Sequence, residues 1–175
     1  LPISVIAQPH LEKLSSRLGE SSSVAVLDGP DIVYVGRVQV RRIMTIGITI
    51  GTRFPAYATS MGRVLLAGLD ETGLDAYFNH VDLEPLTPRT TVNEESLREE
   101  LAPIREQGWC LVDQELEIGL RSLAVPVYDR DGKVVAALNT SMPAHVDVDA
   151  EDIEAQTARV LPLLKAASAQ ASEAF

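Results

Sequence analysis

One stretch of sequence decides how the rest of the chain is arranged: residues 47–68, which read GITIGTRFPAYATSMGRVLLAG. It combines the end of a strand, a loop that contains Gly51 and Pro55, and a short helix. Thr59 or Ser60 is suited to cap the start of that helix, because a short side-chain oxygen can accept hydrogen bonds from the amides of the next turn. The stretch therefore predicts a strand, a tight loop and a capped helix in immediate succession.

The start of this helix is also suited to bind an anion. Its first amides have no partner within the helix and carry a partial positive charge, which favours a carboxylate or a phosphate. Gly62 is expected to leave room for such a group, and Arg53 and Arg63 either add positive charge or form structural ion pairs. The simpler interpretation is an ordinary capped helix that binds nothing, and the local sequence leaves both interpretations open.

The composition is that of an ordinary soluble globule. The 175 residues fit one domain, with 46% hydrophobic and 23% charged residues. A net charge of −10 argues against DNA binding by this stretch, since affinity for DNA depends largely on neutralising phosphates. Cys110 allows no internal disulfide, and no apolar run is long enough to cross a bilayer. With no signal peptide either, we expect a cytoplasmic protein, and the start at Leu1 without methionine indicates a fragment of a longer polypeptide.

Hydrophobic periodicity and turn residues predict helices and strands in separate blocks along the chain. The predicted helices are one that ends at Gly19, one over 60–67, one over 72–79 capped by Asp70, one from a capping box at Thr91–Glu94 to about Gln107, and a last helix from Asp149 with a kink at Pro162. The predicted strands are 23–27, 32–40, 43–50, 109–112, 121–128 and 133–141, with loops over 81–92 and 113–119. Pro126 predicts an edge position or a bulge. This order favours an α+β fold, an antiparallel sheet flanked by helices on its faces.

The clearest hairpin joins strands 121–128 and 133–141 through a turn at 129–132. If Tyr128 pairs with Lys133, one side of this hairpin carries only small and polar residues. Those residues are Ser122, Ala124, Ala137, Asn139 and Ser141. Such residues fill a core poorly but suit the wall of a ligand cavity. The alternative places this side in solvent, and a shift of one residue in the register would exchange the two sides.

Other kinds of site have weaker support. Residues 58–62, Ala-Thr-Ser-Met-Gly, resemble the nucleophile elbow of a serine hydrolase with Ser60 as the nucleophile, but Pro55 interrupts the strand that this motif requires. The histidines are scattered without metal-ligand spacing, and no phosphate-binding or dinucleotide-binding glycine motif is present. We therefore expect no metal and no cofactor. The histidines in question are His10, His80 and His145.

Two sets of motifs, in the same order along the whole chain, resemble the effector-binding domain of the IclR family of bacterial transcriptional regulators. The first set is Gly51-x-Arg53-x-Pro55 followed by Ser60-x-Gly62-Arg63-x-Leu65-Leu66-Ala67, and the second is Gly108-Trp109, Glu115, Gly119 and the run 121–127. Residues 42–45 and 51–63 further resemble a branch of the family that regulates aromatic-acid breakdown through protocatechuate, 4-hydroxybenzoate and β-ketoadipate.

The resemblance implies a GAF-like domain over residues 1–175, joined in the intact protein to an N-terminal winged helix-turn-helix that binds DNA and is absent from this chain. It implies homodimers or tetramers and a small organic acid as effector, held by the helix-start amides at Ser60 and Met61. Val112 stands where glyoxylate-type members carry an acid, and the neighbouring Asp113 should point the other way, so a larger, partly apolar acid fits better. Met44, Met61 and Tyr57 could contact its ring or chain, or simply pack in the core. The effector-binding residues implied are Tyr57, Ala58, Thr59, Ser60, Met61, Ser122, Asn139 and Ser141.

We therefore expect a ligand-sensing domain and not an enzyme. It would bind an aromatic acid or a β-ketoadipate-like dicarboxylate without transforming it, and so modulate transcription of catabolic genes. Two alternatives stay open, a serine hydrolase that uses Ser60 and a ligand-free dimerisation module.

Overall fold

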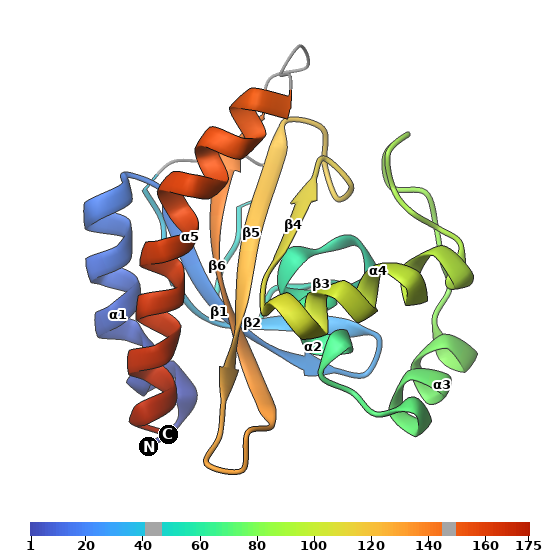
Figure 1. Ribbon diagram of the computed structural model, residues 1–175, viewed down its shortest axis with the longest axis horizontal. Helices are drawn as coiled ribbons and strands as arrows, with labels where there is room; N and C mark the ends of the chain where they lie inside the picture. Colours follow the sequence, from blue (N-terminus) through green and yellow to red (C-terminus); the bar gives the residue numbers. More distant parts are fainter. Residues whose placement is uncertain (41–46, 145–149) are drawn as a thin grey trace.

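The computed structural model describes residues 1–40, 47–144 and 150–175. Within these ranges, one curled six-stranded sheet carries helices on both faces (Figure 1). Its strands are β1 (Ser21–Asp28), β2 (Asp31–Val38), β3 (Arg53–Pro55), β4 (Cys110–Asp113), β5 (Leu120–Tyr128) and β6 (Val134–Pro143). The helices are α1 (Ile3–Leu18), the 3₁₀ turn η1 (Ala56–Ala58), α2 (Ser60–Ala67), α3 (Glu71–His80), α4 (Glu94–Gln107) and α5 (Ala150–Glu173). The predicted α+β class is confirmed.

All neighbouring strands of the sheet run antiparallel, in the order β3-β2-β1-β6-β5-β4. The central pair, β1 and β6, joins the two ends of the chain, so the sheet closes only when distant segments meet. β4 pairs with β5 only as far as Ala124, which leaves Pro126 beyond the end of β4. The edge position predicted for this proline is confirmed, because no strand on that side needs its missing amide.

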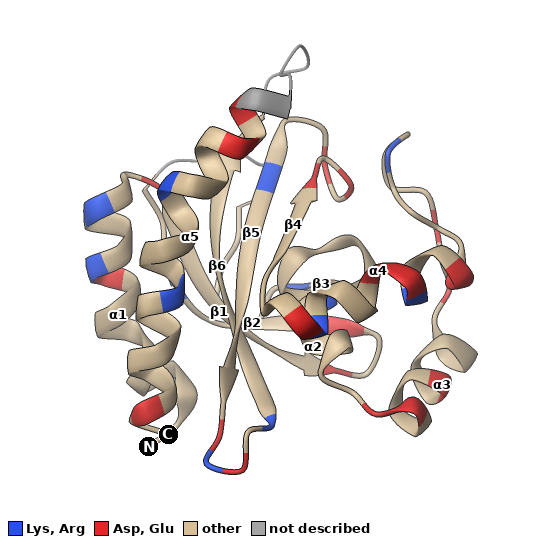
Figure 2. Cartoon of the chain, in the orientation of Figure 1, with Lys and Arg blue, Asp and Glu red and all other residues tan. Residues whose placement is uncertain are grey.

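The sheet separates two hydrophobic clusters. On one face α1 and α5 lie side by side (Figure 1) and enclose Leu11, Leu138 and Leu164. On the other face η1, α2 and α4 enclose a second cluster that includes Met61 and Leu101. Acidic residues lie on α3, α4, α5 and the loops (Figure 2), and few charged residues lie on the strands of the sheet. None of the helices in the described ranges is both long and apolar enough to cross a membrane.

The β5–β6 hairpin has a register two residues away from the predicted one. Ser122 pairs with Ser141 and not with Asn139, because the turn is one residue longer than predicted and a β-bulge beside Tyr128 adds another. An even shift leaves each side chain on its predicted side of the sheet. The small, polar side therefore faces α2 as predicted, and Val134 and Val135, next to the bulge, each turn to the face opposite to the one predicted.

Two local predictions are wrong in the described ranges. α4 is capped by Asn93, whose side chain accepts from the Ser96 amide at 3.0 Å, and not by a capping box at Thr91. The Thr91 amide instead donates to the Glu115 carboxylate at 2.9 Å. Residues 47–50 form no strand, since the Thr49 amide turns back to the Thr52 hydroxyl. The remaining part of that predicted strand, 43–46, and the predicted helix start at Asp149 lie outside the described residues.

Candidate functional site

A small cavity of about 20 Å³ lies between the start of α2 and the small, polar side of the sheet. Its floor comes from β2, β4, β5 and β6, and the residues just before and within the first turn of α2 cover it. Seven of the eight predicted effector-binding residues line it, together with Val112, which the resemblance also places there, and three residues that the sequence did not point to. The lining residues are Tyr34, Ala58, Thr59, Ser60, Met61, Val112, Leu116, Leu120, Ser122, Asn139 and Ser141.

The start of α2 offers amide groups to this cavity. Thr59 has extended backbone angles (φ −122°, ψ 149°), and its hydroxyl accepts from the Gly62 amide at 3.0 Å, so Thr59 and not Ser60 is the cap. The amides of Ser60 and Met61, as the first two of the helix, have no acceptor within it. Because both residues line the cavity, this wall favours an anionic or carbonyl oxygen.

Gly62 has a different role from the one predicted. A Cβ atom at this position would lie 2.1 Å from the carbonyl oxygen of Ala56 and 2.4 Å from the Thr59 hydroxyl. The missing side chain therefore lets α2 pack directly on η1, and Gly62 does not line the cavity. The expectation that it leaves room for the ligand is wrong, because the space it leaves is already filled by backbone.

A chain of hydrogen bonds crosses the cavity wall from α2 to β6. The hydroxyls of Ser60 and Ser122 are 2.6 Å apart, and the Asn139 amide nitrogen donates to Ser122 at 3.0 Å. The Asn139 side chain is only 3% exposed, and its amide oxygen has no hydrogen-bond partner. Turning the amide over would leave its nitrogen without a partner instead, so one polar atom of Asn139 stays unsatisfied in either orientation. A buried polar atom without a partner is costly, and a ligand group would satisfy it.

Tyr34 forms the β2 side of the cavity, and the sequence analysis did not single it out. Its ring packs edge-to-face on Phe54, with 5.8 Å between the ring centroids. Burial raises the pKa of the Tyr34 hydroxyl to about 12, with the nearby Arg37 opposing part of the increase. At neutral pH the hydroxyl is therefore protonated and can donate a hydrogen bond to a ligand.

Arg53 and Arg63 are both structural, so the ion-pair alternative left open for them holds. Arg53 lies at the surface and pairs with Asp28 at 2.9 Å and Asp31 at 3.2 Å. Arg63 is buried behind α2, where it donates to the carbonyl of Tyr57 at 2.9 Å and pairs with Glu115 at 2.6 Å. These carboxylates neutralise both cations, and neither arginine lines the cavity.

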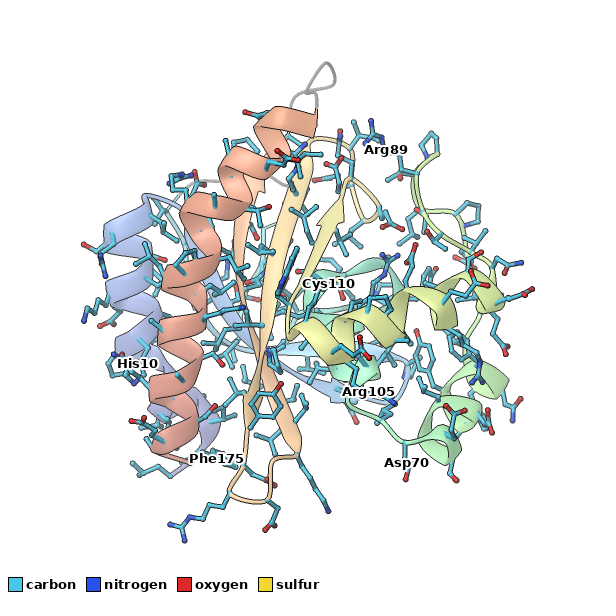
Figure 3. The ribbon with its side chains drawn as sticks, in the orientation of Figure 1. His10, Asp70, Arg89, Arg105, Cys110 and Phe175 are labelled. Carbon is cyan, nitrogen blue, oxygen red and sulfur yellow. The ribbon has the colours of Figure 1, made fainter. Side chains whose placement is uncertain are left out.

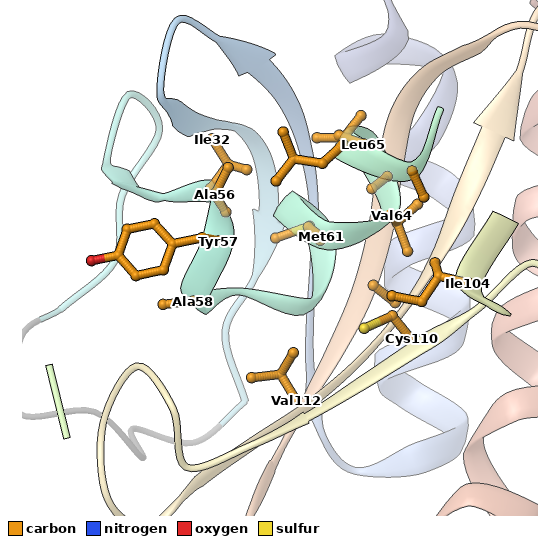
Figure 4. Packing of buried hydrophobic residues seen from close by; sticks show 14 of the residues in the cluster. Ile32, Ala56, Tyr57, Ala58, Met61, Val64, Leu65, Ile104, Cys110 and Val112 are labelled. Atoms are coloured by element: carbon orange, nitrogen blue, oxygen red, sulfur yellow. The ribbon is translucent and has the colours of Figure 1, made fainter. Parts of the chain in front are cut away.

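Tyr57 is the one predicted effector-binding residue that lies outside the cavity. Its ring points away from Met61 and Val112 (Figure 4), and its hydroxyl donates to the carbonyl of Glu84 at 2.8 Å. The same hydroxyl accepts from the Glu84 amide at 2.9 Å, so Tyr57 fastens the loop 81–92 to η1. Met44, also predicted as a possible contact, lies outside the described residues.

The side chains of Val112 and Asp113 point to opposite sides of β4, as the sequence predicts. Val112 lines the cavity, and Asp113 points away from it to pair with Arg121 at 3.0 Å and Arg89 at 2.8 Å. An apolar side chain thus stands at this position of the cavity wall. Leu116, from the predicted loop 113–119, and Leu120, at the start of β5, add to this apolar end.

The described residues assemble neither a metal site nor a hydrolase triad. No group of three or more His, Cys, Asp or Glu side chains gathers among them. The Ser60 hydroxyl pairs with Ser122, and the His80 ring lies on α3 against the carbonyl of Ala76. Figure 3 shows His10 on α1 and Cys110 far from it, in the interior, where burial raises the pKa of the thiol to about 12. His145 lies outside the described residues.

Comparison with known proteins agrees with this arrangement. Residues 1–173 match the family model of the bacterial transcriptional regulator IclR C-terminal domain. The chain is 47% identical to the Pca regulon regulatory protein of Pseudomonas putida over 169 residues, which cover 95% of this chain and 56% of that protein. It therefore spans about half the length of the curated relatives it matches.

Two solved structures extend the comparison. One is the IclR protein of Thermotoga maritima, with a TM-score of 0.87 and 31% identity, covering 99% of this chain and 68% of that one. The other is a double mutant of the PobR inducer-binding domain from Acinetobacter in complex with 3-hydroxybenzoic acid, with a TM-score of 0.85, 32% identity and 98% of each chain covered. The family match over nearly the whole chain and the shared fold lead to one conclusion: this chain belongs to the IclR family of bacterial transcriptional regulators, as their C-terminal domain.

Proposed function

We propose that this chain is the ligand-sensing domain of a transcriptional regulator and that its cavity binds a small organic acid without transforming it. The observation that carries the proposal is the pairing of two features in one cavity. The amides at Ser60 and Met61 suit a carboxylate, and the unsatisfied amide of Asn139 suits a second polar group of the same molecule. The apolar end formed by Val112, together with Leu116 and Leu120, suits a ring or an alkyl chain between them.

The relatives support this chemistry. One relative carries the name Pca regulon regulatory protein, and the PobR domain was solved with 3-hydroxybenzoic acid. An aromatic acid or a β-ketoadipate-like dicarboxylate carries the same pair of polar groups on an apolar body, and the controlled genes would be catabolic. DNA binding would belong to a helix-turn-helix domain outside this chain, which is consistent with the net charge of −10. The intact regulator would be a cytoplasmic homodimer or tetramer.

The mechanism is a shift between arrangements of the domain. An acid that binds one arrangement more tightly than another raises the population of the first by that difference in affinity. The hydrogen bond between Ser60 and Ser122 joins α2 to β5 directly across the cavity wall. A ligand that inserts between these two hydroxyls exchanges this bond for its own, and so changes how α2 sits on the sheet.

The test is titration calorimetry of the chain with protocatechuate, 4-hydroxybenzoate, β-ketoadipate and glyoxylate, repeated with Ser60→Pro and Ser60→Ala. Proline is tolerated in the first position of a helix, and the extended backbone of Thr59 is the conformation that proline requires before it. Ser60→Pro therefore removes an amide from the cavity and leaves α2 in place, while Ser60→Ala removes only the hydroxyl. A hydrogen bond to a charged group is worth about 1.5–3 kcal/mol, so Ser60→Pro should weaken acid binding about 10- to 150-fold beyond the loss in Ser60→Ala.

Two results would speak against the proposal. If none of the four acids binds the folded chain, the cavity is not a sensor for these acids and the ligand-free dimerisation module becomes the better description. If Ser60→Ala abolished turnover of an ester that the wild-type chain hydrolyses, the hydrolase alternative would replace it.

A further inference from the structure

The cavity between α2 and the sheet is too small for the acids proposed to bind there. Its volume of about 20 Å³ leaves room for about one water molecule. Cavities that enclose organic ligands measure roughly 300–1,000 Å³. A ring that carries a carboxylate therefore enters only after part of the cavity wall has moved.

Two of the three parts of this wall are held firmly. The strands that form the floor are paired within the six-stranded sheet. The start of α2 rests on backbone, since a Cβ at Gly62 would lie 2.1 Å from the carbonyl oxygen of Ala56. The third part is the loop 114–119 between β4 and β5, which has no helix or strand of its own and brings Leu116 to the cavity. Among the described parts of the wall, this loop can therefore move with the smallest loss of contacts.

The base of the loop is a fixed frame. Its two ends, Gln114 and Gly119, both have left-handed backbone conformations, with φ of 61° and 91°. The Gly119 amide donates to the side-chain oxygen of Gln114 at 3.0 Å, and the Gln114 amide donates to the carbonyl of Leu120 at 2.9 Å. A residue other than glycine keeps a left-handed conformation only where its surroundings fix it. These bonds tie the two ends of the loop together.

Two threonines from the loop 81–92 hold the first residues of the loop 114–119 from outside. The hydroxyl of Thr87 donates to the carbonyl of Gln114 at 2.7 Å, and that of Thr90 donates to the carbonyl of Glu115 at 2.6 Å. The Glu115 carboxylate also pairs with the buried Arg63 at 2.6 Å. Movement of the loop therefore has to begin after Glu115.

The tip of the loop, residues 116–118, is attached differently. The side chain of Leu116 has no polar atom, so apolar contacts alone hold it against the cavity, and it is only partly buried. The neighbouring Ile118 is 49% exposed. The backbone of the tip closes a turn in which the Leu120 amide donates to the carbonyl of Glu117 at 3.2 Å. The tip can thus move outward as one turn while the base of the loop stays in place.

We propose that the tip of the loop 114–119 is a gate: Leu116 closes the cavity and swings outward to admit and release the acid. The inference rests on the proposed function, because it concerns access to the same cavity. Binding and release both need the gate to open, so a gate slows both steps. The open form is the one that the acid selects, and the observed association rate falls with the fraction of the chain that is open.

The test measures the association and release rates of 4-hydroxybenzoate and β-ketoadipate by surface plasmon resonance on the immobilised chain. The wild type is compared with Leu116→Ala and with Ile118→Ala. Ile118→Ala is the matched control, since it shortens a side chain of the same tip that is 49% exposed and does not line the cavity. Leu116→Ala should raise the association rate constant at least about five-fold and the release rate constant by at least as much, whereas Ile118→Ala should leave both within about two-fold of the wild type.

The association rate separates a gate from a simple contact with the ligand. If Leu116 only contacts the bound acid, its truncation raises the release rate and leaves the association rate unchanged. That pattern, or equal association rates in the two alanine variants, would overturn the inference and leave the proposed function intact, because the acid still binds. If neither acid binds the wild type or Leu116→Ala, and circular dichroism shows both to be folded, the proposed function falls and the gate falls with it.

Discussion

The contact between Gly62 and η1 predicts the effect of a single methyl group. In Gly62→Ala the new Cβ would lie 2.1 Å from the carbonyl oxygen of Ala56 and 2.5 Å from its Cα, so backbone and not a flexible side chain must move. Extra atoms forced into a packed site usually cost about 1–3 kcal/mol. We expect this loss in the free energy of unfolding, together with weaker acid binding, because the start of α2 is displaced from the cavity.

Gly73→Ala is the matched control. Gly73 holds the same position in α3 that Gly62 holds in α2, with its amide capped by Asp70 at 2.8 Å as that of Gly62 is by Thr59 at 3.0 Å. A Cβ at Gly73 would lie 3.3 Å from Asp70 Oδ1 and from Leu69 Cβ, contacts that need an adjustment of only a few tenths of an ångström. Removing backbone freedom from a helix then stabilises the protein by about 0.5–1 kcal/mol. Both substitutions change the unfolded chain alike, so their difference measures the clash.

Urea unfolding monitored by circular dichroism measures both variants. Gly62→Ala should unfold at a lower urea concentration than the wild type and Gly73→Ala at an equal or higher one, with a gap of about 1.5–4 kcal/mol between their free energies of unfolding. Equal stabilities for the two alanine variants would refute the reasoning, since they would show that η1 and α2 separate without cost.

Two further predictions concern buried charge and pH. Glu115→Gln should lower the free energy of unfolding by about 3 kcal/mol, because it leaves the Arg63 guanidinium buried without its 2.6 Å partner. Glu100→Gln should change it by less than about 1 kcal/mol, because the Glu100 side chain is 44% exposed. Equal losses in the two glutamine variants, measured by urea unfolding, would contradict this. The pKa of the Tyr34 hydroxyl is raised, so at high pH the folded chain keeps this proton while the unfolded chain releases it. The contribution of Tyr34 to the free energy of unfolding is therefore fully present below pH 10. It falls as the pH rises from 10 towards 12, by up to about 2–3 kcal/mol. Between pH 9 and pH 11 Tyr34→Phe should make this decline smaller by about 1 kcal/mol, and the part that comes from the raised pKa values of Cys110 and Tyr77 should stay. An unchanged decline in the variant would assign all of it to other groups.

The sequence contains enough information to predict the fold and most of the cavity. Strand alternation in the β5–β6 hairpin places Ser122, Asn139 and Ser141 on one face regardless of a register error of two residues, since only an odd shift exchanges the faces. The bulge itself leaves no local mark, because neither Tyr128 nor Val135 is a residue that bulges require. Likewise, Asn93 and Thr91 are both good caps, and it is the distant Glu115 that decides between them by occupying the Thr91 amide.

Residues that enter the site through tertiary contacts were the ones missed or misplaced. Tyr34 belongs to a strand that is far in sequence from residues 57–61, and only the pairing of β1 with both β2 and β6 brings it to the cavity. Tyr57 is adjacent to cavity residues in sequence, but the turn of η1 directs its ring to the loop at Glu84. The role of Gly62 was misread for the same reason, because nothing in residues 58–62 reveals that the carbonyl of Ala56 folds back against it.

The central sheet is a single layer of backbone between the cavity and the helices α1 and α5. On β5, Ser122 faces the cavity and the next residue, Leu123, packs in the cluster that holds Leu164 of α5. The sheet between the cavity and the hydrophobic cluster under α5 is thus only one peptide unit thick. A displacement of Ser122 by a few tenths of an ångström would move Leu123 by a similar distance, because the two residues are adjacent on β5. The side chains of α5 that contact Leu123 would then have to repack. Only the width of one β-strand therefore separates the cavity from the face of the sheet that α1 and α5 cover.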